Sequence, residues 1–246
     1  MVAPPDNDVL WARGLHHAHG TTPALTGVSL GVRESEIFAV SGPRGSGKTT
    51  LLRCLSGQLV PTRGEVWFNS APVHTLPARH RERLRLDRFG WIDTEPRLVP
   101  ELTAWENAAL PLLLRGLGHR AARRTACEWL ERLDVGQHAR RRPDRLDQSQ
   151  RQRIAIARAL APGPQVIFAD DPAAPLHSAE GSQVLRTLVT AARSHRIAVV
   201  LAGHGPENAA LADRTLTLLD GRQSGAVRSA TDPADEESRE ACSLSA

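Results

Sequence analysis

A glycine-rich segment holds the only lysine of the chain, Lys48, and could bind phosphate. Residues 42–49 read Gly-Pro-Arg-Gly-Ser-Gly-Lys-Thr and fit the pattern G-x-x-x-x-G-K-[ST] of a phosphate-binding loop. All other basic residues, among 31 lysines and arginines, are arginine. A slim ammonium reaches between phosphate oxygens, where a forked guanidinium is no substitute. The pattern therefore predicts a nucleoside triphosphate site; the alternative is an incidental glycine-rich turn.

The sequence around this segment has the context that a phosphate loop requires. An apolar run, Ile37–Val40, precedes it and predicts a strand, and a helical pattern follows over Thr49–Gln58. The order strand, loop, helix favours the nucleotide site over the turn.

Two further places that could do chemistry come directly after predicted strands. Asp170 and Asp171 follow the apolar run Val166–Ala169, and His204 follows a strand predicted over Ile197–Leu201. The ordinary interpretations are a helix cap for Asp170 and a loop residue for His204. The phosphate loop upstream favours a functional role for both.

The elements that must position these residues indicate an α/β fold. A mainly antiparallel layer is predicted at the N-terminus, and later strands alternate with helices, which is typical of a parallel sheet. A long helical stretch interrupts this sheet. The predicted strands cover residues 9–12, 24–30, 37–40, 65–68, 89–93, 166–169, 197–201 and 215–219, and the predicted helices lie at 49–58, at 77–86 and within 103–158.

Composition bounds the class of protein. With 246 residues, 41% of them hydrophobic, the chain suits one large domain, or one domain with a subdomain. Its cysteines, Cys54, Cys127 and Cys242, are far apart and odd in number, which favours a reducing compartment over a disulfide framework or a zinc site. The polar start, Met1–Asp8, has no apolar leader, and no later run approaches a membrane span. We expect a cytoplasmic protein that touches a membrane only through a partner.

Charge is distributed unevenly. The net charge is +4, yet residues 231–246 are acidic and lack periodicity, which predicts a disordered tail after a domain over residues 1–230. Arginines concentrate between Arg115 and Arg158, with hardly any aromatic residue to stack bases. This pattern is typical of a solvated helix surface, so we expect no nucleic-acid partner.

Several segments resemble a known family. Residues 145–160, followed by Pro164–Pro172, resemble the signature helix and Walker B strand of ABC transporter ATPases. Residues 102–107 and 110–116 resemble the subgroup that works with lipoprotein-releasing and macrolide-export permeases. The resemblance covers nearly everything from residue 9 to 222. It implies a P-loop NTPase, RecA-like core with an N-terminal antiparallel β layer and an inserted helical subdomain at about residues 95–160.

The resemblance also implies the roles of the candidate site residues. ATP and Mg²⁺ are the expected cofactors, with Lys48 neutralising phosphate charge and with Thr49 and Asp170 as the metal ligands. Asp171 and His204 are the expected catalytic residues, because they stand where the family has a water-polarising glutamate and a histidine that contacts the γ-phosphate. The cofactor-binding positions are His19, Gly42, Arg44, Gly45, Ser46, Gly47, Lys48, Thr49 and Thr50.

Two departures from the family pattern bear on catalysis. Asp171 is one methylene shorter than the usual glutamate, and a displacement of about 1 Å can cost about a hundredfold in rate. The signature pentapeptide, usually Leu-Ser-Gly-Gly-Gln, is Leu-Asp-Gln-Ser-Gln over residues 146–150. Asp147 would present a carboxylate to the phosphate of a partner subunit, or would simply cap the helix that begins near Ser149. We expect slow hydrolysis and a weak contact between subunits.

Three further positions differ. Thr94 replaces a glutamine that senses Mg²⁺ and couples to the permease, and His177 replaces an aspartate of the loop at which the subunits of the dimer meet. His19 stands in for a tyrosine that stacks on adenine, and its imidazole offers less area.

The resemblance leaves several functions open. One is the ATP-binding subunit of a transporter, at the inner face of the cell membrane, that couples ATP binding and slow hydrolysis to export by a separate permease. Another is a non-hydrolysing regulatory subunit of a heterodimer. In either case we expect a dimer of ATP-binding subunits, and the sequence leaves open whether it is a homo- or heterodimer. A weaker third is an ABC-type protein of nucleic-acid metabolism.

Overall fold

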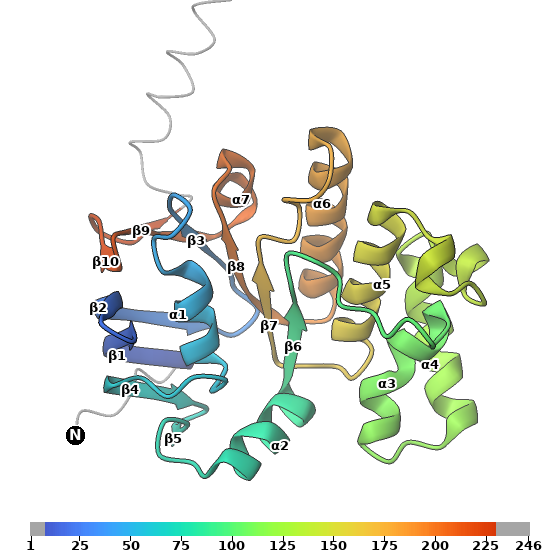
Figure 1. Cartoon of the computed structure of the whole chain (residues 1–246), viewed down its shortest axis with the longest axis horizontal. Coiled ribbons are helices and arrows are strands. Elements are labelled where there is room, and N and C mark those ends of the chain that lie inside the picture. The colour runs from blue at the N-terminus through green and yellow to red at the C-terminus, as the bar shows by residue number, and fades with distance from the viewer. Residues whose placement is uncertain (1–7, 230–246) are drawn as a thin grey trace, which may run out of the picture.

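The computed structural model describes residues 8–229 and shows two β-sheets, with helices packed around the larger one (Figure 1). The predicted acidic tail, residues 231–246, lies outside the described residues. None of the helices between residues 8 and 229 is long and apolar enough to cross a membrane.

The smaller sheet is antiparallel and contains the N-terminal strands. Its order is β2-β1-β4-β5, with β1 (Asp8–His19), β2 (Thr22–Arg33), β4 (Arg63–Phe68) and β5 (Ala71–Pro72). The predicted antiparallel layer is confirmed, but its first two strands are longer than predicted. β-bulges interrupt the pairing of β1 with β2, which breaks the alternation by which a strand is recognised in sequence.

The larger sheet is built on parallel strands. Its order is β10-β9-β3-β8-β7-β6, and β11 pairs with β9. These strands are β3 (Ile37–Ser41), β6 (Phe89–Ile92), β7 (Val166–Asp170), β8 (Ala198–Gly203), β9 (Arg214–Leu219), β10 (Arg222–Gln223) and β11 (Arg228–Ser229). β3, β6, β7, β8 and β9 pair in parallel, so their carboxyl ends meet at one edge. The predicted parallel sheet interrupted by helices is confirmed.

The helices lie on both sides of this sheet (Figure 1). They are α1 (Lys48–Leu55), α2 (Ala78–Arg88), α3 (Ala104–Leu114), α4 (His119–Arg132), α5 (Gln148–Leu160), α6 (Ser178–Ser194) and α7 (Pro206–Leu211), with short 3₁₀ turns at Gly136–His138 and Pro143–Arg145. α1 ends three residues before the predicted Gln58. Helices α3, α4 and α5 lie together and fall within the predicted helical subdomain.

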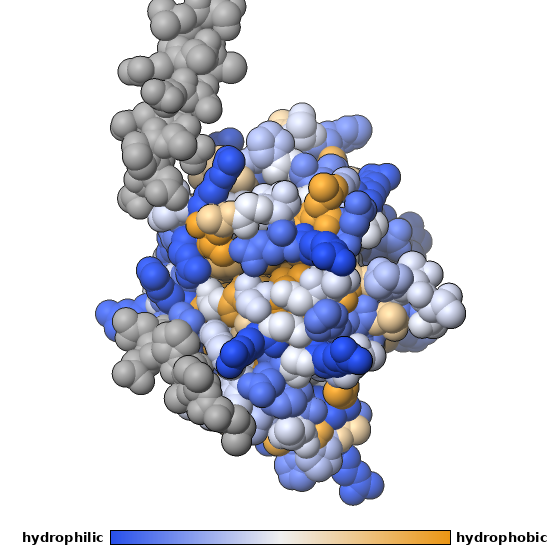
Figure 2. Space-filling view, turned by 90° about the vertical axis from the view of Figure 1, so that its left-hand side faces the viewer, coloured by the Kyte–Doolittle hydropathy of each residue, from blue (hydrophilic) through white to orange (hydrophobic). Residues whose placement is uncertain are grey.

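Alternate residues of the central strands enter two different cores. In β3, Ile37 and Ala39 pack with residues of α3, α4, α5 and α6, whereas Phe38 and Val40 pack with α1 and the antiparallel sheet. Since side chains alternate across a strand, the central strands β3, β7 and β8 are buried on both faces and are almost entirely apolar. The face over the smaller sheet shows polar side chains around a central area of less polar ones (Figure 2).

Candidate nucleotide-binding site

The predicted phosphate loop lies between the end of β3 and the start of α1. Gly47 caps α1 with φ of 100°, and a Cβ there would lie 2.3 Å from the carbonyl oxygen of Ala24. At Gly42, with φ of 152°, a Cβ would lie 2.2 Å from the carbonyl oxygen of Leu218. Both positions therefore require glycine, and the glycines of the sequence pattern are explained by backbone packing.

Lys48 lies inside the loop. Its side chain is buried, and Nζ donates to the carbonyl oxygens of Gly42 at 2.7 Å and Pro43 at 2.8 Å. Burial lowers the pKa of the Lys48 ammonium, and the carboxylates of Asp171 and Asp170 oppose this shift. Two backbone carbonyl oxygens thus hold the ammonium at the loop, and the oxygens of a bound anion could replace them.

Ser46 carries a buried hydroxyl without a partner. The residue is 2% exposed, and its Oγ makes no hydrogen bond within the described residues. The adjacent N-terminus of α1 adds unpaired backbone N–H groups and the positive end of a helix dipole. A buried hydroxyl beside such a terminus fits an oxyanion ligand. The side chain of Arg44, by contrast, is exposed and forms no hydrogen bond or ion pair within the described residues.

Asp170 and Thr49 form a pair of oxygen ligands. Asp170 ends β7, is 7% exposed, and accepts a hydrogen bond on Oδ1 from the Thr49 hydroxyl at 3.0 Å. Burial raises the pKa of Asp170. The hydrogen bond from Thr49 lowers this pKa, and the nearby carboxylate of Asp93 raises it further. A desolvated carboxylate beside a hydroxyl is a donor set that suits Mg²⁺.

Asp171 and His204 are in direct contact. Nδ1 of His204 donates to Oδ2 of Asp171 at 2.7 Å. Asp171 adopts the left-handed conformation with φ of 47°, which aspartate tolerates better than most residues. The two residues follow neighbouring parallel strands, β7 and β8, so the sheet brings together groups that are 33 positions apart.

His19 reaches the loop from the other sheet. It lies at the end of β1 and is exposed, and its Nε2 is 3.1 Å from Oγ1 of Thr50 on α1. The ring of His17 packs edge-on at 5.1 Å between centroids. The contact with Thr50 holds the imidazole beside the start of α1, where a base could stack on it.

The N-terminus of α5 is closed by its own side chains. Oδ1 of Asp147 accepts the backbone N–H of Gln150 at 2.8 Å, and Oε1 of Gln150 accepts the N–H of Asp147 at 3.2 Å. This is a capping box. The predicted helix cap at Asp147 is confirmed, with the helix beginning at Gln148, one residue before Ser149. No hydrogen bond among the described residues joins Asp147 to the phosphate loop.

Thr94 and Gln152 connect helices α3, α4 and α5, here called the helical segment, to this site. The Thr94 hydroxyl donates to the carbonyl oxygen of Asp170 at 2.8 Å, and Nε2 of Gln152 donates to that of Asp93 at 3.1 Å. Gln152 is fully buried, and its Oε1 has no partner within the described part of the chain. The sequence interpretation missed Gln152. Its signal was a polar residue on the same face of α5 as the apolar Ile156.

The predicted site residues mostly gather at the carboxyl edge of the parallel strands. The phosphate loop follows β3, Asp170 and Asp171 lie at the end of β7, and His204 follows β8. This edge is where open α/β sheets bind ligands. His177, by contrast, is the N-cap of α6 and forms no side-chain capping bond.

Comparison with known proteins agrees with this arrangement. The family model described as ABC transporter matches residues 25–174, more than half of the chain. The chain belongs to the ABC transporter family. ABC ATPase cassettes are a family whose members bind ATP.

Named relatives support the same assignment. The lipoprotein-releasing system ATP-binding protein LolD 2 of Caulobacter vibrioides is 36% identical over 217 residues, 87% of this chain and 95% of the relative. ABC transporter ATP-binding protein YtrE of Bacillus subtilis is 35% identical over 83% of this chain and 89% of the relative. An uncharacterized ABC transporter ATP-binding protein of Mycobacterium tuberculosis (strain H37Rv) is 38% identical over 79% of this chain, but the match spans only 59% of that longer protein.

Solved ABC cassettes share the fold. The dimeric post-hydrolysis structure of the cassette MJ0796, bound to ADP and Pi, superposes with a TM-score of 0.83 at 30% identity, covering 91% of this chain and 99% of that one. Another dimeric structure of the same cassette gives a TM-score of 0.81 at 29% identity. The predicted fold class, a P-loop NTPase core with an antiparallel β layer, is confirmed for this ABC cassette.

Proposed function

We propose that this ABC cassette binds Mg-ATP at its own phosphate loop and couples that binding, with slow hydrolysis, to export by a separate membrane permease. The observation that carries the proposal is the pairing of a complete phosphate loop around Lys48 with the Thr49–Asp170 oxygen pair, 3.0 Å apart. In this proposal the protein is cytoplasmic and peripheral at the inner face of the membrane. The subgroup resemblance and the lipoprotein-releasing relative support export.

The residues of the loop would each contribute to nucleotide binding. Lys48 would exchange its two carbonyl partners for β- and γ-phosphate oxygens, and Ser46 Oγ would gain the partner it lacks. Thr49 and Asp170 would hold Mg²⁺, which neutralises charge on the phosphates. His19 would stack on the base with a ring that Thr50 already orients.

Asp171 and His204 would act on the attacking water. One oxygen of Asp171 already accepts from His204, which leaves the other to accept a proton from water. The short aspartate side chain holds that oxygen further from the γ-phosphate than a glutamate would, so the water is poorly placed. The shorter side chain supports slow hydrolysis.

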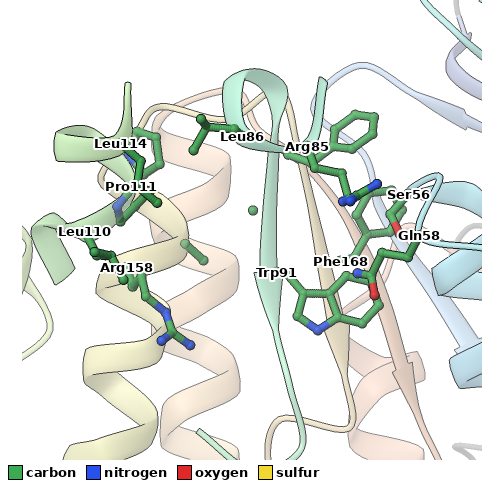
Figure 3. Close-up of a pocket in the computed structure, with 14 residues that line it drawn as sticks. Ser56, Gln58, Arg85, Leu86, Trp91, Leu110, Pro111, Leu114, Arg158 and Phe168 are labelled. Atoms are coloured by element: carbon green, nitrogen blue, oxygen red, sulfur yellow. The ribbon is translucent and has the colours of Figure 1, made fainter. Parts of the chain in front are cut away.

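A groove between the core and the helical segment would receive the permease. It has a volume of about 430 Å³ and opens between Trp91 and Phe168 on one side and Leu110 and Leu114 on the other (Figure 3). Leu114 is 63% exposed, more than any other large apolar side chain within residues 8–229. A short apolar helix from a cytoplasmic loop of the permease fits such a groove.

The positive charge of the groove indicates which residue type the permease segment carries. Arg158 projects between the two walls, with Arg85 on the core side (Figure 3). Burial lowers the pKa of both guanidinium groups. No acidic residue of the described chain lines the groove. We therefore expect an acidic residue on the permease segment, and Leu114→Asp should prevent co-purification with the permease while leaving ATP binding intact.

A second candidate is a regulatory subunit of a heterodimer that holds ATP without hydrolysing it. The capping box of Asp147 and Gln150 favours it, because the N-terminus of α5 already carries a carboxylate where the family places a partner's phosphate. An unlike cassette with an intact signature would then complete the site of this chain.

One experiment separates the two candidates. Mg-ATP binding and turnover are measured on one purified sample, alone and with the permease, for the wild type and for Asp171→Glu. Turnover that rises with Asp171→Glu supports the slow transport ATPase. Tight binding with no turnover in either protein supports the regulatory subunit. Absence of ATP binding would refute both.

A further inference from the structure

A second groove lies between α4 and α6, apart from the nucleotide site and the permease groove. Its volume is about 530 Å³, within the range of about 300–1,000 Å³ that small-molecule sites occupy. No residue that lines it belongs to either of the other sites. The lining residues are Trp129, Arg132, Leu133, Gln183, Arg186, Thr187, Thr190, Ala191, Ser194 and His195.

The groove carries positive charge without a counter-charge. Its lining contains Arg132 and Arg186 and no acidic residue of the described chain. Arg186 makes no hydrogen bond or ion pair between residues 8 and 229. Arg132 lies over the ring of Trp129, with its central carbon 5.0 Å from the ring centroid, and the only hydrogen bond of its side chain within residues 8–229 is to His195. Two guanidinium groups are thus available to an anion.

Hydrogen bonds orient one of these groups. Nδ1 of His195 lies 2.9 Å from the carbonyl oxygen of Ala191, so Nδ1 carries the proton and donates. Nε2 can then accept from Nη1 of Arg132, at 3.2 Å. The imidazole also packs against Trp129 at 4.8 Å between ring centroids. Arg132 is therefore held by a stacking contact and a hydrogen bond, which lowers the entropy lost on binding.

The hydroxyl groups that α6 contributes to the groove indicate a second feature of the ligand, its hydrogen-bond donors. The Thr187 hydroxyl donates to the carbonyl oxygen of Gln183 at 2.8 Å, and the Ser194 hydroxyl donates to that of Thr190 at 2.8 Å. With their protons engaged, both oxygens offer only lone pairs to the groove. They suit a ligand that donates hydrogen bonds, such as one with hydroxyl groups.

We propose that this groove binds a small hydroxylated organic anion, with its anionic group on Arg132, with Arg186 adding to the positive charge of the same groove, and with its hydroxyl groups facing Thr187 and Ser194. Sugar phosphates and hydroxy carboxylates both combine an anionic group with hydroxyl groups in this way. α4 belongs to the helical segment and α6 follows the nucleotide site, so the ligand contacts both. The proposal is independent of the proposed ATP function.

Binding is tested by titration calorimetry on the full chain with Mg-ADP in excess, so that phosphate probes do not occupy the phosphate loop. The probes are glucose 6-phosphate, gluconate and neutral glucose. We expect saturable binding of one or both anions and none of glucose. Binding of glucose 6-phosphate alone assigns the site to phosphate esters, and binding of gluconate extends it to carboxylates.

Variants place the binding in the groove. Arg132→Gln and Arg186→Gln should each weaken binding of the anion by about tenfold, because each removes a positive charge from the groove. Arg79→Gln is the matched control, since Arg79, like Arg186, is exposed and forms no hydrogen bond or ion pair within the described residues, but lies on α2. Circular dichroism checks that each variant is folded. No saturable heat up to about 10 mM anion, equal binding of glucose, or affinities unchanged by both groove variants would overturn the proposal.

Discussion

Two helix N-termini of this cassette, at α1 and at α5, are built for opposite outcomes. At α1 the N-cap is Gly47, no side chain caps the helix, and the buried Ser46 hydroxyl beside it lacks a partner within the described chain. At α5 the N-cap is Asp147, whose carboxylate and reciprocal partner Gln150 close the terminus. The first terminus is open to an anion and the second already holds one.

This difference shows how one side chain changes the function of the same local geometry. A helix N-terminus attracts anions through its unpaired N–H groups and its dipole. A carboxylate cap accepts a hydrogen bond from one of those donors and stabilises the helix, and it repels a second anion. The cassette is thus suited to hold ATP at its own loop, but poorly suited to contact the ATP of a partner.

The largest expected effect comes from removing the ammonium at the open terminus. Lys48→Ala should weaken Mg-ATP by about 100-fold, because it removes charge-assisted hydrogen bonds to the phosphates. Lys48→Arg should fail to restore affinity, since the forked guanidinium does not fit the loop. Titration calorimetry measures both variants. Affinity within about threefold of wild type for Lys48→Ala would show that the open terminus is not the nucleotide site.

Lengthening the catalytic carboxylate should have the next largest effect. Asp171→Glu should raise ATP turnover by about tenfold, because it moves the carboxylate toward the attacking water. Mg-ATP affinity should stay the same, since Asp171 is not expected to ligand the metal. The measurement is steady-state phosphate release, with Asp171→Asn as the inactive control. Turnover unchanged by the longer side chain would place the limitation at α5.

The closed terminus is opened by replacing Asp147. Asp147→Ala should lower the free energy of unfolding by about 1 kcal/mol, through loss of the cap. Asp147→Ser retains capping and should change stability by less than about 0.5 kcal/mol, while it removes the negative charge. Thermal unfolding and light scattering with Mg-ATP measure the two effects. If Asp147→Ser gives no more ATP-driven association than wild type, the carboxylate is not what limits the contact.

The smallest expected effect is the change in stability with pH that the buried Asp170 causes. Burial raises its pKa above the ordinary value of 3.8, so the native protein binds more protons than the unfolded chain above that pH. The free energy of unfolding therefore falls as pH rises through this window. Asp170→Asn should remove this dependence and raise the Tm slightly near neutral pH, while Mg²⁺-dependent nucleotide binding is lost.

The matched control for that experiment is Asp220→Asn, an exposed residue after β9. Its substitution should leave both the Tm and nucleotide binding unchanged. A lower Tm for Asp170→Asn than for wild type at neutral pH would contradict the desolvation argument.

The sequence predicted those features that depend on local patterns. The phosphate loop and the cap at Asp147 follow from spacing along a few neighbouring residues, and the sheet follows from apolar runs. The contact of His204 with Asp171 and that of Thr94 with the backbone of Asp170 could not be predicted, because they depend on which strands become neighbours. The length of β1 was missed because its bulges hide the alternation.

The most direct test of this account measures Mg-ATP binding, turnover and ATP-driven self-association on one purified sample. The account predicts one nucleotide bound per chain, little association, and turnover barely above that of Lys48→Ala. Turnover at a rate ordinary for an ABC ATPase, together with a stable ATP-bound homodimer, would contradict it, because the carboxylate at α5 would then be compatible with a partner's phosphate.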